Sequence, residues 1–137
     1  MQYWLIKSEP DVYSFQQLVA DGSTRWDGVR NYQARNNLRA MRLGDLCLFY
    51  HSNIGLEIVG VARVIREYYP DPTATEGDWS AVDVEAVCAL ERPVPLREIK
   101  EHPALRQIGL VRNPRLSVMP LTEREFNLLL ELGQMRL

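Results

Sequence analysis

The pattern of apolar and polar residues along the chain predicts more strand than helix. Several short apolar runs are bounded by Gly, Pro, Asn or Asp, which is typical of buried strands. Over residues 79–91, apolar and acidic positions alternate, so one face is expected in the core and the other, with Asp83 and Glu85, in solvent. The expected strands cover residues 3–7, 46–52, 56–68, 79–91 and 115–118.

Helices are predicted where apolar residues recur every three or four positions behind a capping residue. Asn31 is a suitable N-cap for a helix over 32–41, in which Ala34, Leu38 and Met41 form the buried stripe. The other expected helices cover 15–20 and 123–132, with a helical turn over 96–101. Several strands with few, peripheral helices indicate an α+β fold, either a small, mostly antiparallel barrel or a curled sheet.

Length and composition fit one folded domain over residues 1–137. Hydrophobic residues make up 46% and charged residues 25%, which is the balance of a globular protein. No apolar run approaches the ~18 residues of a membrane span, and no signal peptide is recognised, so a cytoplasmic protein is expected, or a nuclear one in a eukaryote. Cys47 and Cys88 lie in apolar runs and are expected to be reduced.

Charge is unevenly distributed along the chain although the net charge is only −2. Residues 25–42 hold five arginines against Asp27 alone, whereas residues 43–91 hold nine acids against two arginines. The overall charge excludes a uniformly basic nucleic-acid binder, but it leaves room for a local basic face.

The richest candidate site is Trp26-Asp-Gly-Val-Arg-Asn-Tyr-Gln-Ala-Arg35, which combines two aromatic rings, amides and two guanidiniums. Aromatic rings can stack on a nucleobase, amides can read a base edge, and arginines can grip phosphate. The alternative is that Trp26 and Tyr32 belong to the core and that the arginines form a solvated helix face.

Two shorter motifs follow strand ends. Lys7-Ser8-Glu9 places a cation, a hydroxyl and a carboxylate directly after the first buried strand, and His51-Ser52 lies at the end of the second, where it runs into a turn. Neither has a nucleophile motif, and a structural hydrogen bond is the favoured role of His51. No metal-ligand spacing or Gly-rich cofactor loop is present, so neither metal nor cofactor is expected.

The motifs YWLIKSEP, WDGVRNYQARN, GDLCLFYHSN, EIVGVARVIREYYPDPT and RLSVMPLTEREF resemble, in order and spacing, those of the EVE domain family. The resemblance runs from Tyr3 to about Leu132. It implies a PUA-like fold, a compact β-barrel with helices around it. It also implies a reader of modified bases, such as methylated or hydroxymethylated cytosine in DNA, or modified RNA, that holds a flipped base in a pocket.

The resemblance also implies roles for individual residues. The residues expected to line the pocket walls are Lys7, Ser8, Trp26, Val29, Asn31 and Tyr32. Those expected to close its polar end are His51 and Ser52. Those expected to hold flanking phosphates are Arg30, Arg35 and Arg115. Trp79 is expected to be either core or lid, and the short stretch Ala74–Asp78 replaces a longer insert of many relatives.

The sequence therefore predicts a non-enzymatic nucleic-acid-binding module, whose effector, if it has one, is a separate chain. One alternative is an RNA-associated enzyme or enzyme subunit that uses Lys7, Glu9 or His51 in acid–base chemistry. A second alternative is a module that binds a small metabolite or a protein in the same pocket.

Overall fold

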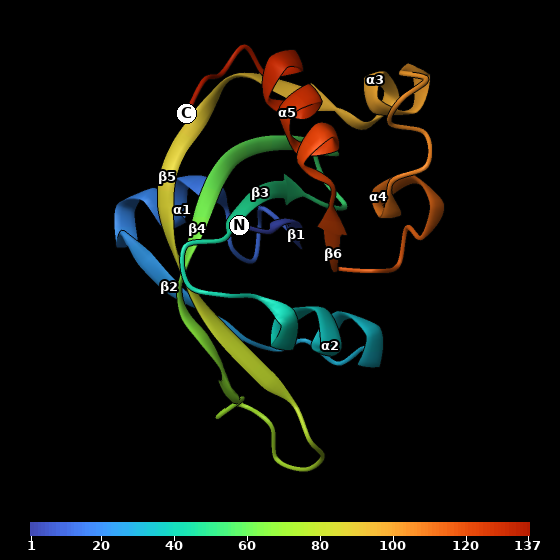
Figure 1. The fold of residues 1–137 in the computed structure, drawn as a ribbon. Coiled ribbons are helices and arrows are strands. Elements are labelled where there is room, and N and C mark those ends of the chain that lie inside the picture. Colours follow the sequence, from blue (N-terminus) through green and yellow to red (C-terminus); the bar gives the residue numbers. More distant parts are fainter.

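A computed structural model describes residues 1–137 and contains a single six-stranded sheet with five helices packed around it (Figure 1). The strands are β1 (Tyr3–Ser8), β2 (Ser23–Trp26), β3 (Leu46–His51), β4 (Glu57–Pro70), β5 (Ser80–Pro95) and β6 (Val118–Leu121). The helices are α1 (Phe15–Asp21), α2 (Tyr32–Ala40), α3 (Leu96–Glu101), α4 (Gly109–Arg112) and α5 (Glu123–Leu132). The α+β class predicted from the sequence is confirmed.

The sheet is curled but open, so the curled-sheet alternative is confirmed, and the β-barrel implied by the resemblance does not close. Its order is β2-β5-β4-β3-β1-β6, so β2 and β6 are the edge strands and do not pair with each other. Only β1 and β3 are parallel; the other pairs are antiparallel. Helix α2 lies across the gap: Asn37 Nδ2 donates to Val118 O of β6 at 2.7 Å, and Arg39 Nε donates to Ser80 Oγ of β5 at 2.9 Å.

The sequence signals for α2 describe its packing. Asn31 is the N-cap, and its side chain accepts a hydrogen bond from Ala34 N at 2.9 Å. Ala34, Leu38 and Met41 are fully buried, as their spacing predicts. The first turn of α2 is therefore fixed beside the residues that precede it, 26–30.

Gly60 is needed for the packing of α1 on the sheet. A Cβ atom at this position would overlap the ring of Phe15, the first residue of α1. The pairing of β4 and β5 shifts register beside Gly60, and Phe15 packs edge-to-face on Phe49 of β3. A strand glycine here marks a close approach between elements.

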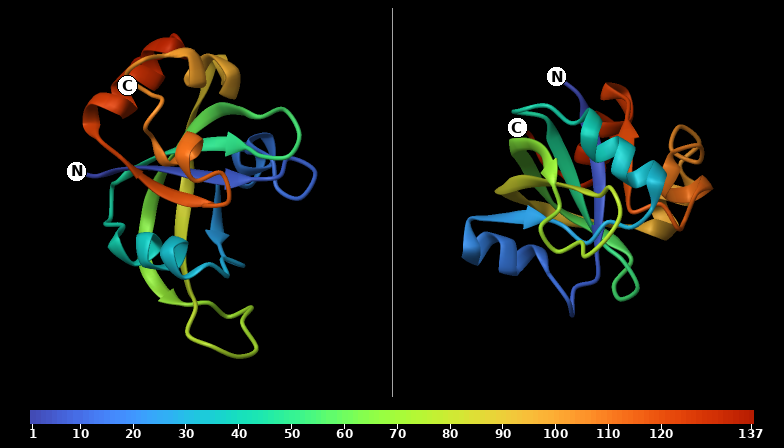
Figure 2. Two further views of the ribbon diagram at one scale, coloured as in Figure 1. Left: turned by 90° about the vertical axis from the view of Figure 1, so that its right-hand side faces the viewer. Right: turned by 90° about the horizontal axis from the view of Figure 1, so that it is seen from below.

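Strands β4 and β5 form a long twisted ribbon that extends past α2 and ends in the loop over residues 71–79 (Figures 1 and 2). Asp83 and Glu85 on this ribbon are not fully solvated, in contrast to the prediction. Tyr69 O–H donates to Asp83, and Arg63 pairs with Glu85 at 2.8 Å. Facing side chains on β4 thus shield the acidic positions of β5.

Two elements were not predicted, β2 and α4, and β6 begins three residues later than the expected strand over 115–118.

Cys47 is buried and Cys88 is half-buried, and both are free thiols, as expected. None of the helices combines the length and the apolar character that a membrane span requires.

Candidate nucleic-acid interface

A pocket of about 520 Å³ opens at the seam where the curled sheet fails to close. One side comes from the edge strand β2 and the segment after it, and the other from the end of β1 and the residue before β6. The lining residues are Lys7, Ser8, Val12, Tyr13, Thr24, Arg25, Trp26, Asp27, Gly28, Val29, Arg30 and Ser117. Its volume lies within the about 300–1,000 Å³ usual for small-molecule sites.

Trp26 is both a core residue and a wall of this pocket. It is only 8% exposed, and its ring meets Phe49 edge-to-face at 5.4 Å. The chain turns directly afterwards at Gly28, whose φ of +76° lies in the left-handed region. Val29, the next residue in the lining, is 7% exposed. The two readings of Trp26 drawn from the sequence, core and site, are therefore compatible.

Asp71, in the loop after β4, anchors the segment that forms the wall. Its side chain is fully buried, and Oδ2 accepts hydrogen bonds from Gly28 N and from Arg30 Nη1, each at 2.9 Å. Oδ1 accepts from Thr73 N at 2.8 Å and from Thr73 Oγ1 at 2.7 Å. Burial alone raises the pKa of Asp71, but these hydrogen bonds outweigh it and hold that pKa well below its usual range.

The other side of the pocket carries a cation. Lys7 Nζ donates to Pro114 O at 2.9 Å and lies 5.8 Å from the centre of the Tyr50 ring, and burial lowers the pKa of this lysine. Ser8 Oγ donates to Tyr13 O at 2.7 Å. Lys7 makes no ion pair with a carboxylate, so its charge is available to a ligand.

His51 and Ser52 lie beside this region but do not line the pocket. His51 is paired with Ser8 across β1 and β3, and its Nε2 accepts a hydrogen bond from Phe15 N at 3.1 Å. Burial lowers the pKa of His51, against an opposing effect of Glu57, so the neutral imidazole is favoured. Ser52 N donates to Ser8 O at 3.0 Å. The backbones of both residues hold the end of β1, and the His51 side chain holds the start of α1.

Tyr32 and Arg35 lie on α2, outside the pocket lining. Tyr32 is 67% exposed and stacks on Trp79, with ring centres 5.1 Å apart and planes 13° apart. Arg35 lies 5.0 Å from the centre of the Tyr32 ring and donates to Asp78 O at 3.1 Å. Trp79, the last residue of the loop over 71–79, is thus half-buried against α2. Arg115 is exposed close to the pocket, two residues before Ser117.

The structure therefore brings together Lys7, Ser8, Trp26, Val29 and Arg30 in one pocket. It places Asn31 at the cap of α2 and Tyr32 on the outside. Sequence reasoning missed Asp71 and Tyr13. The signal for Asp71 was present, since an acid directly after a strand, followed by Pro and Thr, is a frequent hydrogen-bond acceptor for nearby backbone.

A second hollow, of about 680 Å³, lies between α5, the C-terminal residues and the start of β1 and β3. Its lining includes Tyr3, Leu46, Phe126 and Leu130 but none of the residues selected from the sequence. No group of three or more His, Cys, Asp or Glu side chains is arranged to hold a metal ion. The pocket beside Trp26 is the hollow that contains residues selected from the sequence, among them the Trp26 indole and Lys7, a cation without an ion-pair partner.

Comparisons with known proteins agree with the sequence motifs. Thymocyte nuclear protein 1 of Mus musculus is 42% identical over 166 positions, covering 96% of this chain and 74% of the mouse protein. The alignment is longer than this chain, so the mouse protein carries inserted residues. A crystal structure of a protein from Agrobacterium tumefaciens superposes with a TM-score of 0.96 at 46% identity, covering 98% of this chain and 94% of the other.

Human thymocyte nuclear protein 1, solved in complex with DNA containing 5-methylcytosine, superposes with a TM-score of 0.90 at 38% identity over 100% of both chains. A YTH domain of Zygosaccharomyces rouxii, solved with N6-methyladenosine RNA, has a TM-score of 0.62 at 19% identity, covering 99% of this chain and 86% of the other, and shows a common fold only. The model of the EVE domain matches residues 2–132. This chain belongs to the EVE domain family.

Proposed function

We propose that this chain is a non-enzymatic reader of a modified base, which it holds in the pocket beside Trp26 after the base has left its stack. The observation that carries the proposal is the composition of the pocket: a buried indole and the Lys7 ammonium on opposite edges of the open seam. A flat, partly apolar ring with polar edges fits such a site, because the ring can stack while its edges meet donors and acceptors.

The relatives favour modified cytosine in DNA as the ligand. The human protein that superposes along the entire chain was solved with DNA containing 5-methylcytosine. An added methyl group would contact apolar surface, which Trp26 and Val29 supply in the pocket. The likeness to the RNA-bound YTH domain concerns the fold alone, so RNA is the other outcome of the binding test. The mouse relative is named as a nuclear protein, which suits a protein that works where DNA is held.

The hydrogen bonds of the polar groups support binding rather than catalysis. Nε2 of His51 already accepts from Phe15 N, and the hydroxyl of Ser8 already donates to Tyr13 O. Neither side chain is paired as nucleophile and base. Turnover of a modified oligonucleotide that is abolished by His51→Ala would instead identify the chain as an enzyme.

The sequence-independent part of binding is assigned to cations without carboxylate partners. Lys7, Arg35 and Arg115 make no ion pair, whereas Arg25, Arg30, Arg39 and Arg42 each pair with an acid. These three free cations at the proposed interface, on a chain with a net charge of −2, predict a shallow salt dependence, equivalent to about two to four phosphate contacts.

The proposal is tested by substitutions in the pocket. Trp26→Ala should weaken binding to a 5-methylcytosine oligonucleotide at least about tenfold, because base–aromatic stacking contributes roughly 1–3 kcal/mol per base. Trp26 also packs on Phe49, so Ser117→Leu serves as a second variant that fills the pocket without a change in the core. Unchanged affinity of folded Ser117→Leu and Trp26→Ala proteins would refute the pocket assignment.

A further inference from the structure

A second aromatic surface, which we call the outer platform, lies outside the pocket and consists of Tyr32, Trp79 and Arg35. Tyr32 stands on the first turn of α2 and is 67% exposed, although its ring is stacked nearly parallel to that of Trp79. Tyr32 does not line the pocket. Its sequence neighbour Asn31 caps α2, so the backbone that carries the ring is fixed.

The distances within the outer platform show that one face of Tyr32 is open. Arg35 Cζ lies 5.0 Å from the Tyr32 ring centre and 5.8 Å from that of Trp79, while the two rings are 5.1 Å apart. These three nearly equal distances place the guanidinium beside the stacked pair. A guanidinium on the far face of Tyr32 would lie much farther from Trp79. The outer face of the ring is therefore free to stack on another flat group.

The outer platform and the pocket are connected by the same set of contacts. Arg30 lines the pocket, and its guanidinium lies 5.6 Å from the centre of the Trp79 ring. Asp71 accepts from Arg30 and from Gly28 N, and Asp71 N donates to Trp79 O at 2.9 Å. Arg39 pairs with Asp78 at 2.7 Å and so holds the other end of the loop on α2. The two surfaces are thus held in a constant relation before a ligand binds.

We propose that the outer face of Tyr32 stacks a second base of the bound strand, one that flanks the base held in the pocket. This inference rests on the proposed function and adds that the preferred ligand is a single-stranded or locally unpaired segment, because a base stacked on Tyr32 cannot also stack within a duplex. Arg35, which has no carboxylate partner, supplies positive charge for the strand beside this base.

The test uses short single strands with one central 5-methylcytosine and their counterparts in which the nucleotides on one side are abasic. The abasic strand keeps its phosphates but offers no flanking base. Loss of the flanking bases on one of the two sides should weaken binding to the unsubstituted protein at least about fivefold. The Tyr32→Ala protein should bind the complete strand as weakly as the unsubstituted protein binds the abasic strand. Its affinity should not fall further when the abasic strand is used. Tyr32→Phe keeps the ring and should behave like the unsubstituted protein.

The inference is overturned if Tyr32→Ala binds the complete strand with unchanged affinity. It is also overturned if Tyr32→Ala lowers the affinity for the abasic strands, relative to the unsubstituted protein, as much as it lowers the affinity for the complete strand. Trp26→Ala separates this result from the proposed function. A protein that loses affinity with Trp26→Ala but not with Tyr32→Ala has the pocket without the second stacking site. If neither variant weakens binding, both proposals are wrong.

Discussion

Asp71→Asn should destabilise the protein because an amide cannot replace the four hydrogen bonds that the carboxylate accepts. Each carboxylate oxygen accepts from one backbone N–H, that of Gly28 or that of Thr73, and from one side chain. Asparagine has a single acceptor oxygen, so its NH₂ group must face one of these N–H donors. Whichever way the amide turns, a backbone N–H loses its partner.

The size of the effect follows from these contacts. An unsatisfied buried N–H costs roughly 1–3 kcal/mol, and a hydrogen bond to a charged group contributes about 1.5–3 kcal/mol. The side chain of Arg30 is 39% exposed, so solvent screens its share and the lower part of each range applies. The expected loss is about 2–3 kcal/mol, which lowers Tm by about 7–10 °C in a chain of this length.

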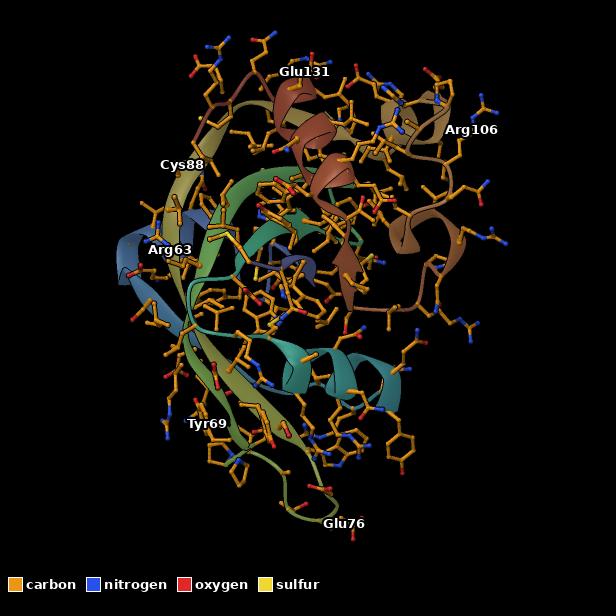
Figure 3. All side chains as sticks on the ribbon, in the orientation of Figure 1. Arg63, Tyr69, Glu76, Cys88, Arg106 and Glu131 are labelled. Atoms are coloured by element: carbon orange, nitrogen blue, oxygen red, sulfur yellow. The ribbon has the colours of Figure 1, made fainter.

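Thermal unfolding followed by circular dichroism, at neutral pH, measures this loss. Glu76→Gln is the matched control: Glu76 lies at the tip of the same loop, exposed and without a hydrogen-bond or ion-pair partner, and the variant removes the same charge (Figure 3). It should leave Tm unchanged. If Asp71→Asn unfolds at the same temperature as Glu76→Gln, the anchoring role of Asp71 is wrong.

Three further changes have defined outcomes. Gly60→Ala should cost about 1–3 kcal/mol in urea unfolding, because the new methyl group overlaps the Phe15 ring; a neutral result would mean that α1 is not held against β4 as described. The pKa of His51 is lowered from 6.5, so the unfolded chain takes up a proton first and stability should fall as pH drops below that value. His51→Gln should reduce this fall in urea midpoints between pH about 7.5 and about 5.5, and parallel curves would contradict it. Arg35→Ala should weaken modified and unmodified strands alike and reduce the salt slope by about one; a loss confined to the modified strand would argue against a phosphate contact.

Local signals account for most of the elements that the sequence predicted. The cap at Asn31 and the stripe of Ala34, Leu38 and Met41 define α2, because capping and apolar spacing act within a few residues. The helix expected over 123–132 is α5, and Thr122 begins it with a capping box in which both hydrogen bonds are formed. Such elements need little information from the remainder of the chain.

The elements that were missed depend on distant partners. Ser23–Trp26 has no strong strand pattern and becomes β2 through pairing with residues 82–85 of β5. The strand expected over 79–91 continues in the structure to Pro95 and so includes Pro93. Proline is tolerated there because no strand pairs with the outer edge of β5 beyond Glu85. The open seam likewise depends on the curl of the complete sheet, which local patterns do not report.

The candidate site shows the same division. The motif around Trp26 identified the wall of the pocket, but residues adjacent in sequence point to two places, because the chain turns at Gly28 and then begins a helix. Trp26 and Arg30 line the pocket, whereas Tyr32 stacks on Trp79 outside it. The anchor, Asp71, comes from a loop more than forty residues along the chain from Gly28, and no role in the site was predicted for it from the sequence.

The most direct test of base reading compares two single strands that differ only in the methyl group of one central 5-methylcytosine, titrated with the unsubstituted protein at two salt concentrations. The methylated strand should bind more tightly, both affinities should fall together as salt rises, and their ratio should stay constant, because the phosphate contacts are common to both strands. Equal affinities at both salt concentrations would contradict the proposal that the pocket beside Trp26 reads the modification.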